Sequence, residues 1–278
     1  MTFLARMAES SRERVRAARA KESEAALERR ALAQPLPPAL LLGEFDVIAE
    51  LKLRSPAAGR LARGGFDART QLASYARGGA AAVSVLTEPT EFRGELEHLA
   101  HAAEVLKPKR PAMRKDFLVD PYQVLEARAA GAGGVLVILA MLDDAAVRAL
   151  VDCARRCDMF VLLEAFDRAD LERLSAYDAP ATTGGPPLLA GVNCRDLRDL
   201  QVRFERFAEL KPHLPRHLKT VAESGIASAA NVDAVVEAGY RLALVGSSLM
   251  SAADPAAALA ALIAAGRAAV AGRQSVCS

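Results

Sequence analysis

The stretch VIAELKLRSPAAG at residues 47–59 decides how this chain is expected to fold. It starts as a strand, along which successive side chains point to opposite faces. One face is then apolar throughout, made by Val47, Ala49, Leu51 and Leu53. The other face places Glu50 and Lys52 after Ile48. A carboxylate and an ammonium are costly to bury on such a strand unless they are paired, so a structural ion pair and a functional pair are both open interpretations.

The strand ends in a polar turn, Arg54-Ser55-Pro56, followed by Gly59. In closed barrels and in open α/β sheets, ligands bind at the carboxyl ends of the strands. We therefore expect a binding site where this strand ends.

Composition narrows the class of protein. The 278 residues fit one large domain or two small ones, and 52% apolar residues suffice for a substantial core. A net charge of +2, with basic and acidic residues interleaved, argues against a nucleic-acid surface. No apolar run reaches about 18 residues and the first residues lack the apolar core of a secretory signal, so we expect no membrane partner. Four cysteines make no disulfide framework and indicate a reducing cytoplasm.

Seven further strand-like runs follow, and each is followed by a helical pattern. The runs cover residues 80–87, 110–117, 133–140, 158–166, 188–194, 218–224 and 241–247. The helical patterns cover residues 67–77, 95–107, 121–130, 143–157, 168–177, 203–211, 228–238 and 254–265. Glycines at 78–79, 131 and 239 end three of them, as is usual in repeating βα units.

Eight strands with eight following helices predict an α/β fold, a (β/α)₈ barrel. An open doubly wound sheet is the alternative, but it ordinarily has GxGxxG after its first strand, and that motif is absent. We assign residues 46–270 to the barrel and residues 271–278 to a loose tail. Residues 1–45 form a helical extension: one or two amphipathic helices over 2–32, stopped by the prolines at 35–38. Its expected role is a flap over the barrel mouth, with a functionless charged helix as the alternative.

Polar residues gather where the predicted strands end, and a barrel would bring them to one mouth. They are Glu50, Lys52, Ser55, Lys115, Asp116, Glu164, Asn193, Arg195, Glu223, Ser224, Gly225, Gly246, Ser247 and Ser248. Several lysines and glutamates in one mouth can supply an acid and a base near neutral pH. The ESGI and VGSS turns after the last two strands suit phosphate binding by backbone N–H groups.

Histidine chemistry and metal binding are not expected. All four histidines fall on predicted helices or their ends, and Cys153 and Cys157 are best read as buried thiols of one helix. Cys194 points away from its neighbour Asn193 on a strand, so we do not predict a nucleophile there. Cys277 falls in the predicted tail.

With these residues identified, the chain resembles the indole-3-glycerol phosphate synthase family from about Val47 to Leu259. The resemblance rests on a series of motifs in order: AELKLRSPAAG, SVLTEPTEFRG, MRKDFLVDPYQVLEAR, LLEAF, GVNCRDL, AESGI and LVGSSLM. It implies closure of an indole ring from carboxyphenylamino-deoxyribulose phosphate, with loss of carbon dioxide and water, in tryptophan biosynthesis. It also implies a phosphorylated small-molecule substrate, with neither a metal nor an organic cofactor.

The resemblance assigns roles residue by residue. Lys115 would be the general acid for the sugar carbonyl and Glu164 its acid/base counterpart. Lys52 would meet the substrate carboxylate, with Glu50 orienting it. The remaining matches are Asn193 and Glu223 as further polar groups, Arg195 of the NxRDL pattern, Phe92 and Phe117 as walls around the aromatic ring, and Ser55, Ser224, Gly225, Gly246 and Ser247 at the phosphate. A lysine partly desolvated in a barrel is expected to approach the acidity that proton donation needs.

The sequence departs from the family pattern at Ala57, Glu95, Gly133 and Ala165-Phe166. No assigned catalytic group is lost, but a paralogue with another aryl substrate stays open. So do an aldolase-like barrel that uses a lysine as a Schiff base and a non-catalytic phosphate-binding barrel. A monomer and a homodimer are equally compatible with the sequence.

Overall fold

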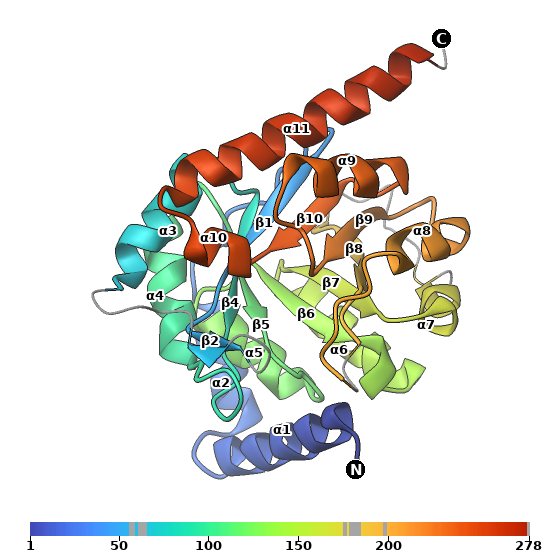
Figure 1. Ribbon diagram of the computed structural model, residues 1–278. Coiled ribbons are helices and arrows are strands. Elements are labelled where there is room, and N and C mark those ends of the chain that lie inside the picture. The colour runs from blue at the N-terminus through green and yellow to red at the C-terminus, as the bar shows by residue number, and fades with distance from the viewer. Residues whose placement is uncertain (56–58, 61–65, 175–176, 178–184, 197–198, 277–278) are drawn as a thin grey trace.

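A closed barrel of eight parallel strands forms the centre of the computed structural model, which describes residues 1–55, 59–60, 66–174, 177, 185–196 and 199–276 (Figure 1). Around the barrel the strands are β1 (Asp46–Leu51), β10 (Leu242–Val245), β9 (Lys219–Glu223), β8 (Leu188–Asn193), β7 (Phe160–Ala165), β6 (Gly134–Ile138), β5 (Ala112–Lys115) and β4 (Ala82–Leu86). The predicted (β/α)₈ barrel is confirmed, and the open sheet is excluded because β1 pairs with both β4 and β10.

Helices surround the strands in the predicted alternation. They are α3 (Ala68–Arg77), α4 (Leu96–Leu106), α5 (Pro121–Ala129), α6 (Asp144–Arg156), α7 (Arg168–Arg173), α8 (Arg206–Leu210), α9 (Ala229–Glu237), α10 (Ser247–Ser251) and α11 (Pro255–Val276). The described residues also include the 3₁₀ turns η1 (Leu139–Met141) and η3 (Lys211–His213). Side-chain caps start several helices as local chemistry dictates: Asp67, Asp120, Asp143, Asp167 and Ser228 each accept a backbone N–H.

Alternation along the strands divides the core into two layers. Val47, Ala49 and Leu51 belong to the outer layer, between barrel and helices. Ile48 belongs to a smaller cluster inside the barrel, together with apolar side chains such as Leu162. The predicted faces of the first strand are confirmed, and Glu50 therefore points to the inside, above the apolar layer.

The polar turn after β1 has more structure than the sequence indicated. A two-stranded antiparallel sheet joins β2 (Arg54–Ser55) to β3 (Gly59–Arg60), with Arg54 opposite Arg60. Strands of two residues are too short to show an alternation of apolar and polar residues, so the sequence could not predict them.

The amino-terminal extension folds as α1 (Phe3–Arg19) and α2 (Glu24–Leu32), as predicted. Helix α1 lies at the mouth, where it contacts η1 just beyond β6, and Met7 packs against the cluster inside the barrel. Helix α2 packs on α5 and buries Leu27 and Ala31 in the outer layer.

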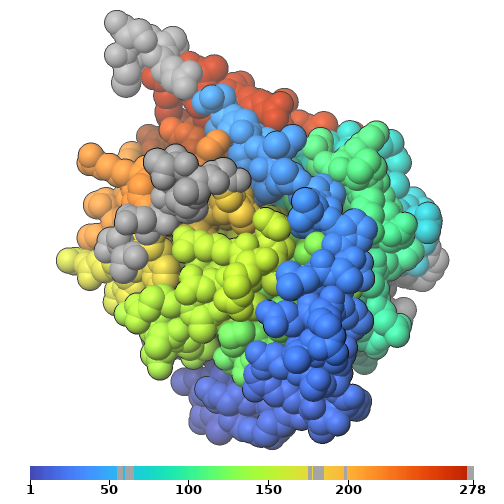
Figure 2. All heavy atoms as spheres, turned by 180° about the vertical axis from the view of Figure 1, so that it is seen from behind, coloured from blue at the N-terminus to red at the C-terminus, as the bar shows by residue number. Residues whose placement is uncertain are grey.

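The segment after α2 crosses to the opposite end of the barrel. Leu40 and Leu42 pack against the inner cluster, and Lys219 at the start of β9 donates to the carbonyl oxygen of Gly43 at 2.7 Å. The first part of the chain thus touches the mouth, one side and the amino end of the barrel, and Figure 2 shows it as a continuous blue band. Only α1 lies where a flap over the mouth would lie, and the flap role stays a prediction.

Helix α11 runs to Val276, across the boundary proposed at residue 270, and projects past the barrel in Figure 1. Cys277 lies outside the described residues. Contrary to the expectation from apolar runs, residues 255–273 are long and apolar enough to cross a membrane, with a mean hydropathy of 1.5. The alanine-rich sequence accounts for this value, while Leu259, Leu262 and Ile263 are buried in the outer layer of the barrel. That packing is typical of a helix that belongs to the barrel.

Candidate active site

A cavity of about 320 Å³ opens at the carboxyl ends of the barrel strands. Of the predicted site residues, all but Ser55 line it: Glu50, Lys52, Phe92, Lys115, Phe117, Glu164, Asn193, Arg195, Glu223, Ser224, Gly225, Gly246 and Ser247. Ser55 lies on β2, but its side chain is outside the part of the chain that the structure describes, so its contact stays a prediction. The strand-end reasoning therefore located one continuous cavity.

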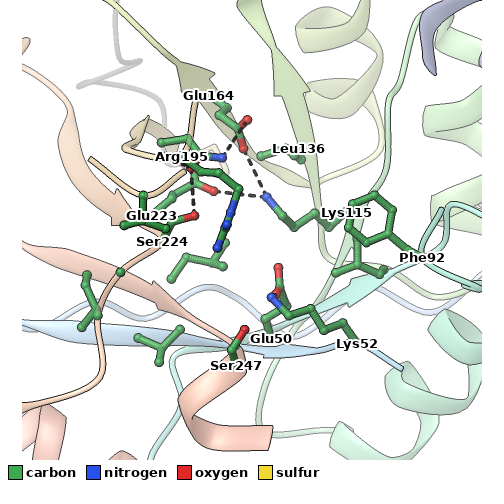
Figure 3. A pocket seen from close by; sticks show the side chains of 18 of the residues that line it. Glu50, Lys52, Phe92, Lys115, Leu136, Glu164, Arg195, Glu223, Ser224 and Ser247 are labelled. Carbon is green, nitrogen blue, oxygen red and sulfur yellow. Dashed lines mark hydrogen bonds and ion pairs between the residues drawn. The ribbon is translucent and has the colours of Figure 1, made fainter. Parts of the chain in front are cut away.

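Lys115 stands at the centre of a charged cluster at the end of β5 (Figure 3). Its Nζ lies 3.2 Å from Glu164 Oε2 on β7 and 3.2 Å from Glu223 Oε2 on β9. All three side chains point into the barrel, because each residue falls on the inward phase of its strand. Both carboxyl groups are almost fully buried and the lysine side chain is 15% exposed, so solvent screens these contacts weakly.

The protonation states of this cluster differ from the expectation. Burial alone would lower the pKa of Lys115, but the carboxylates of Glu164, Glu223 and Glu50 outweigh it and raise that pKa above its usual value. The expectation that desolvation makes this lysine more acidic is therefore wrong for the free protein. Burial raises the pKa of Glu223 to about 8, with Glu164 adding to the effect and Lys115 opposing it. Near neutral pH both raised pKa values favour the protonated forms of Lys115 and Glu223, and the negative charge beside the ammonium then comes from Glu164 and Glu50.

Asn193 connects this cluster to the neighbouring loop. Its Nδ2 donates to Glu164 Oε1 at 3.3 Å, while its Oδ1 accepts from the Ser224 hydroxyl at 2.9 Å and from the Arg195 backbone at 3.0 Å. Ser224 has a φ of 73°, a left-handed conformation that a serine rarely adopts. Strained residues of this kind persist where the surrounding structure fixes them, which is common at functional sites.

A second ion pair lies across the cavity. Lys52 Nζ is 2.6 Å from Glu50 Oε1, and the two side chains are 14% and 5% exposed. Burial would raise the pKa of Glu50, but Lys52, Lys115 and Arg195 lower it below its usual value, so Glu50 is ionised. Gly246 makes the pair possible, since a Cβ there would collide with Glu50 Oε1.

Gly191 similarly leaves room for the cluster of Lys115, Glu164 and Glu223, because a Cβ at residue 191 would collide with Glu223 Oε1. The sequence analysis did not single out Gly191. Its position inside GVN, two residues before Asn193 and on the same strand face, is the signal that could have identified it.

Three aromatic rings form one wall of the cavity. Phe117 lies 6.2 Å from Phe92 and 5.8 Å from Phe3, measured between ring centroids. Phe3 comes from α1, which the sequence predicted as an amphipathic helix, but its place in the cavity was missed. Glu88 fixes the turn that carries Phe92: its buried carboxylate accepts the backbone N–H groups of residues 90, 91 and 92.

The opposite wall is built from backbone and hydroxyl groups. Ser224 and Gly225 follow β9, and Gly246 and Ser247 join β10 to α10. Gly225 also has a left-handed φ of 75°, and a Cβ there would come within 2.8 Å of Val202. The loops after β9 and β10 thus offer small side chains and accessible amides, a suitable surface for an oxyanion.

The described cysteines lie outside the cavity lining. Cys194 is buried in the outer layer and donates to the Ser224 carbonyl oxygen at 3.4 Å. Cys153 is buried in α6, and Cys157 is buried at the C-cap of that helix. Within the described residues, no group of three or more histidine, cysteine, aspartate and glutamate side chains is arranged to hold a metal ion. The arrangement supports acid–base chemistry on a substrate that carries an aromatic ring and an anionic group.

Solved structures with the same fold share little sequence with this chain. A 3-hexulose-6-phosphate synthase from Salmonella typhimurium matches 81% of the chain and all of its own with a TM-score of 0.63 at 16% identity. An orotidine 5'-phosphate decarboxylase from Pyrococcus horikoshii matches 79% of the chain and 99% of its own with a TM-score of 0.55 at 16% identity. These matches support the barrel fold alone.

Sequence relatives are much closer. The indole-3-glycerol phosphate synthase of Verminephrobacter eiseniae is 42% identical over 80% of this chain and 81% of its own length. The enzyme of that name from a Nocardioides species is 44% identical over 76% of each chain. The model of the indole-3-glycerol phosphate synthase family matches residues 4–262, and so includes α1 and α2. The chain belongs to the indole-3-glycerol phosphate synthase family.

Proposed function

We propose that the cavity at the barrel mouth carries out the family's decarboxylating ring closure, with Lys115 as the proton donor. The observation that carries the proposal is the position of Lys115, whose ammonium lies between two buried carboxyl groups and between the aromatic and phosphate walls. The substrate has matching parts: an anthranilate ring, a ketose carbonyl and a terminal phosphate.

The chemistry balances with the groups present. Lys115 protonates the carbonyl oxygen while the ring carbon that bears the carboxylate forms a bond to the carbonyl carbon. Carbon dioxide then leaves, and its bonding electrons restore the aromatic ring. Glu164 takes a proton from the carbon next to nitrogen while the new hydroxyl departs as water with the proton held by Glu223. The proton gained by Glu164 and one proton from solvent then restore Lys115 and Glu223 to their starting states. Because the pKa of Lys115 is raised, the proton is in place when the substrate arrives.

Lys52 and Arg195 provide positive charge for the substrate carboxylate. Glu50 neutralises and orients Lys52 at 2.6 Å. Arg195 is held by a hydrogen bond of 2.7 Å from its Nη1 to the Leu200 carbonyl oxygen, which keeps the guanidinium at the cavity. Asn193 orients Glu164 through its amide.

The serine and glycine loops after β9 and β10 receive the phosphate, with Ser55 from β2 as a further contact. Fixing the phosphate at one wall and the aromatic ring at the other brings the reacting carbons together, which lowers the entropic cost of reaching the transition state. The substrate is a phosphorylated small molecule, and we place the protein in the cytoplasm.

The Schiff-base alternative requires a neutral lysine as nucleophile. The carboxylates around Lys115 favour its charged form, which disfavours that reaction. Borohydride trapping with a ketose phosphate separates the two mechanisms, since proton donation forms no covalent adduct.

The direct test is the production of indole fluorescence from 1-(2-carboxyphenylamino)-1-deoxyribulose 5-phosphate. The chain contains no tryptophan, so an indole signal can come from the product alone. We expect fluorescence to rise in step with carbon dioxide release. A folded protein that releases neither would contradict the proposed function.

A further inference from the structure

We infer that Arg14 of α1 is a positioning residue for the reaction, acting through Asp116 on the neighbouring Lys115 and Phe117. The inference rests on the proposed function and extends it to a helix outside the barrel. The guanidinium of Arg14 reaches Asp116 with two hydrogen bonds, Nη2 to Oδ1 at 2.8 Å and Nη1 to Oδ2 at 2.9 Å.

Asp116 lies between two groups of the site. Lys115 precedes it at the end of β5 and Phe117, in the aromatic wall, follows it. Its carboxylate also accepts the Phe117 backbone N–H at 2.8 Å and the Thr87 hydroxyl at 2.7 Å. The backbone N–H of Thr87 in turn donates to the Lys115 carbonyl oxygen at 3.1 Å. The orientation of the Asp116 carboxylate is therefore linked by hydrogen bonds to the backbone of Phe117 and, through Thr87, to the backbone of Lys115.

Asp116 has other partners besides Arg14. Arg114 Nη2 lies 3.0 Å from Asp116 Oδ2, but Arg114 also pairs with Glu126 at 3.1 Å, so Arg14 supplies the second positive charge of this group. Arg14 Nε is buried without a hydrogen-bond partner among the described residues, which is unfavourable for stability. The contact of Arg14 with both carboxylate oxygens fixes the orientation of Asp116 as well as balancing its charge, which a lysine could not do.

A second contact from the same helix supports this reading. The Ser11 hydroxyl, fully buried, donates to the Phe117 carbonyl oxygen at 2.5 Å and accepts from Gln123 Nε2 at 2.8 Å. Ser11 and Arg14 lie three residues apart on one face of α1, so the helix holds residues 116 and 117 at two points. The same helix contributes Phe3 to the cavity.

The test is a kinetic comparison of Arg14→Met, Arg14→Lys and Arg16→Met in the full chain with the carboxyphenylamino substrate. Arg16 lies on the same helix but is 64% exposed and pairs with Glu9, so it is the matched control. We expect Arg14→Met to lower kcat by about 10- to 100-fold, the range for a catalytic group displaced by about 1 Å. Arg14→Lys should recover part of the loss because it keeps the charge but not the two-pronged geometry. Arg16→Met should match the unmodified protein.

Two further variants separate positioning from simple docking of α1. Phe3→Ala removes the α1 side chain at the cavity and should raise KM with kcat little changed. Ser11→Ala removes the second contact and should lower kcat in the same sense as Arg14→Met, though less. Inhibition by inorganic phosphate, which probes the opposite wall, should be equal in all variants.

If Arg14→Met only raises KM, as Phe3→Ala does, or leaves both parameters unchanged, Arg14 merely docks the helix and the inference is wrong. An Arg14→Met protein that does not fold would also overturn it, because the contact would then be structural. Inactivity of the unmodified protein would instead contradict the proposed function, so the two failures are distinct.

Discussion

The two lysines of the cavity have similar exposure but different surroundings. Lys115, 15% exposed, lies 3.2 Å from the carboxyl groups of Glu164 on β7 and Glu223 on β9. Burial lowers its pKa, but the charge of these two groups and of Glu50 outweighs burial and raises it. Lys52, 14% exposed, has one partner, Glu50, at 2.6 Å on its own strand end. The partners of Lys115 thus come from two other strands of the barrel, whereas the partner of Lys52 lies two residues away in the sequence.

This difference indicates a division of labour. A lysine flanked by two acids can give up a proton and regain it within the same cluster, which general acid catalysis requires. A lysine in a single close pair acts mainly as a fixed positive charge for a bound anion. The account therefore predicts that changes at the two lysines affect different kinetic parameters.

The largest effect is expected for Lys115→Met. Losing the general acid should lower kcat by about 10²- to 10⁴-fold, with substrate binding little changed, because proton donation stabilises the transition state rather than the bound substrate. Steady-state rates of indole formation measure this. Lys107→Met, at an exposed lysine paired with Glu104, is the control and should have no effect.

A smaller and mixed effect is expected for Lys52→Met. It removes a charge that already meets the bound substrate, and it leaves the buried Glu50 without its close partner. KM should rise and kcat should fall, with a combined loss in kcat/KM of about 10- to 100-fold, the equivalent of about 1.5–3 kcal/mol for a charged hydrogen bond. A pure kcat effect would show that Lys52 has the role assigned to Lys115.

Gly246→Ala sharpens the comparison without removing either lysine. The added Cβ would collide with Glu50 Oε1 and come within 3.1 Å of Lys52 Nζ, and none of its three nearest atoms belongs to Lys115, Glu164 or Glu223. We expect kcat/KM to fall by about tenfold through displacement of the Lys52 pair. The control is Gly272→Ala in α11, where a Cβ meets no heavy atom within 4 Å. An effect as large as that of Lys115→Met would mean that the two lysines are not independent.

The last of these predictions concerns stability and pH and leaves both lysines unchanged. The pKa of Glu223 is raised to about 8 from its ordinary 4.5, so the folded state holds this proton more tightly than the unfolded state. The contribution to stability is therefore full below pH 4.5 and is lost as the pH rises towards 8. In Glu223→Gln the side chain cannot titrate, so this variant is the reference. The free energy of unfolding is measured in urea for both proteins, and the value of the unmodified protein minus that of the variant should fall between about pH 5 and pH 8. A difference that stays constant over this range would show that Glu223 titrates normally.

The sequence predicted the barrel because its signals are local and repeated. Strand runs such as 188–194 are bounded by turns, and glycines such as Gly239 end the preceding helices, so each βα unit could be recognised separately. The same pattern predicted the site. Lys115, Glu164 and Glu223 each lie at the carboxyl end of a predicted strand, and a barrel brings these ends together.

What the sequence could not show depends on contacts between distant segments. The sequence predicted the amphipathic helix α1, but it did not show that Phe3 lines the cavity or that Arg14 reaches Asp116. The acidity of Lys115 was predicted in the wrong direction, because burial could be inferred from one strand while the opposing carboxylates come from two others. The need for glycine at 191 and 246 likewise appears only when the carboxylates they face are in place.

The most direct test of Lys115 as the proton donor separates binding from chemistry in both lysine variants. Substrate binding is followed at equilibrium by anthranilate fluorescence, free of tryptophan background, and carbon dioxide release is followed in a single turnover with enzyme in excess. Lys115→Met should bind the substrate almost normally and release carbon dioxide at least about 100-fold more slowly, while Lys52→Met should lose both affinity and rate. If Lys115→Met instead keeps a near-normal single-turnover rate, Lys115 is not the donor, and the acid must be sought at Lys52.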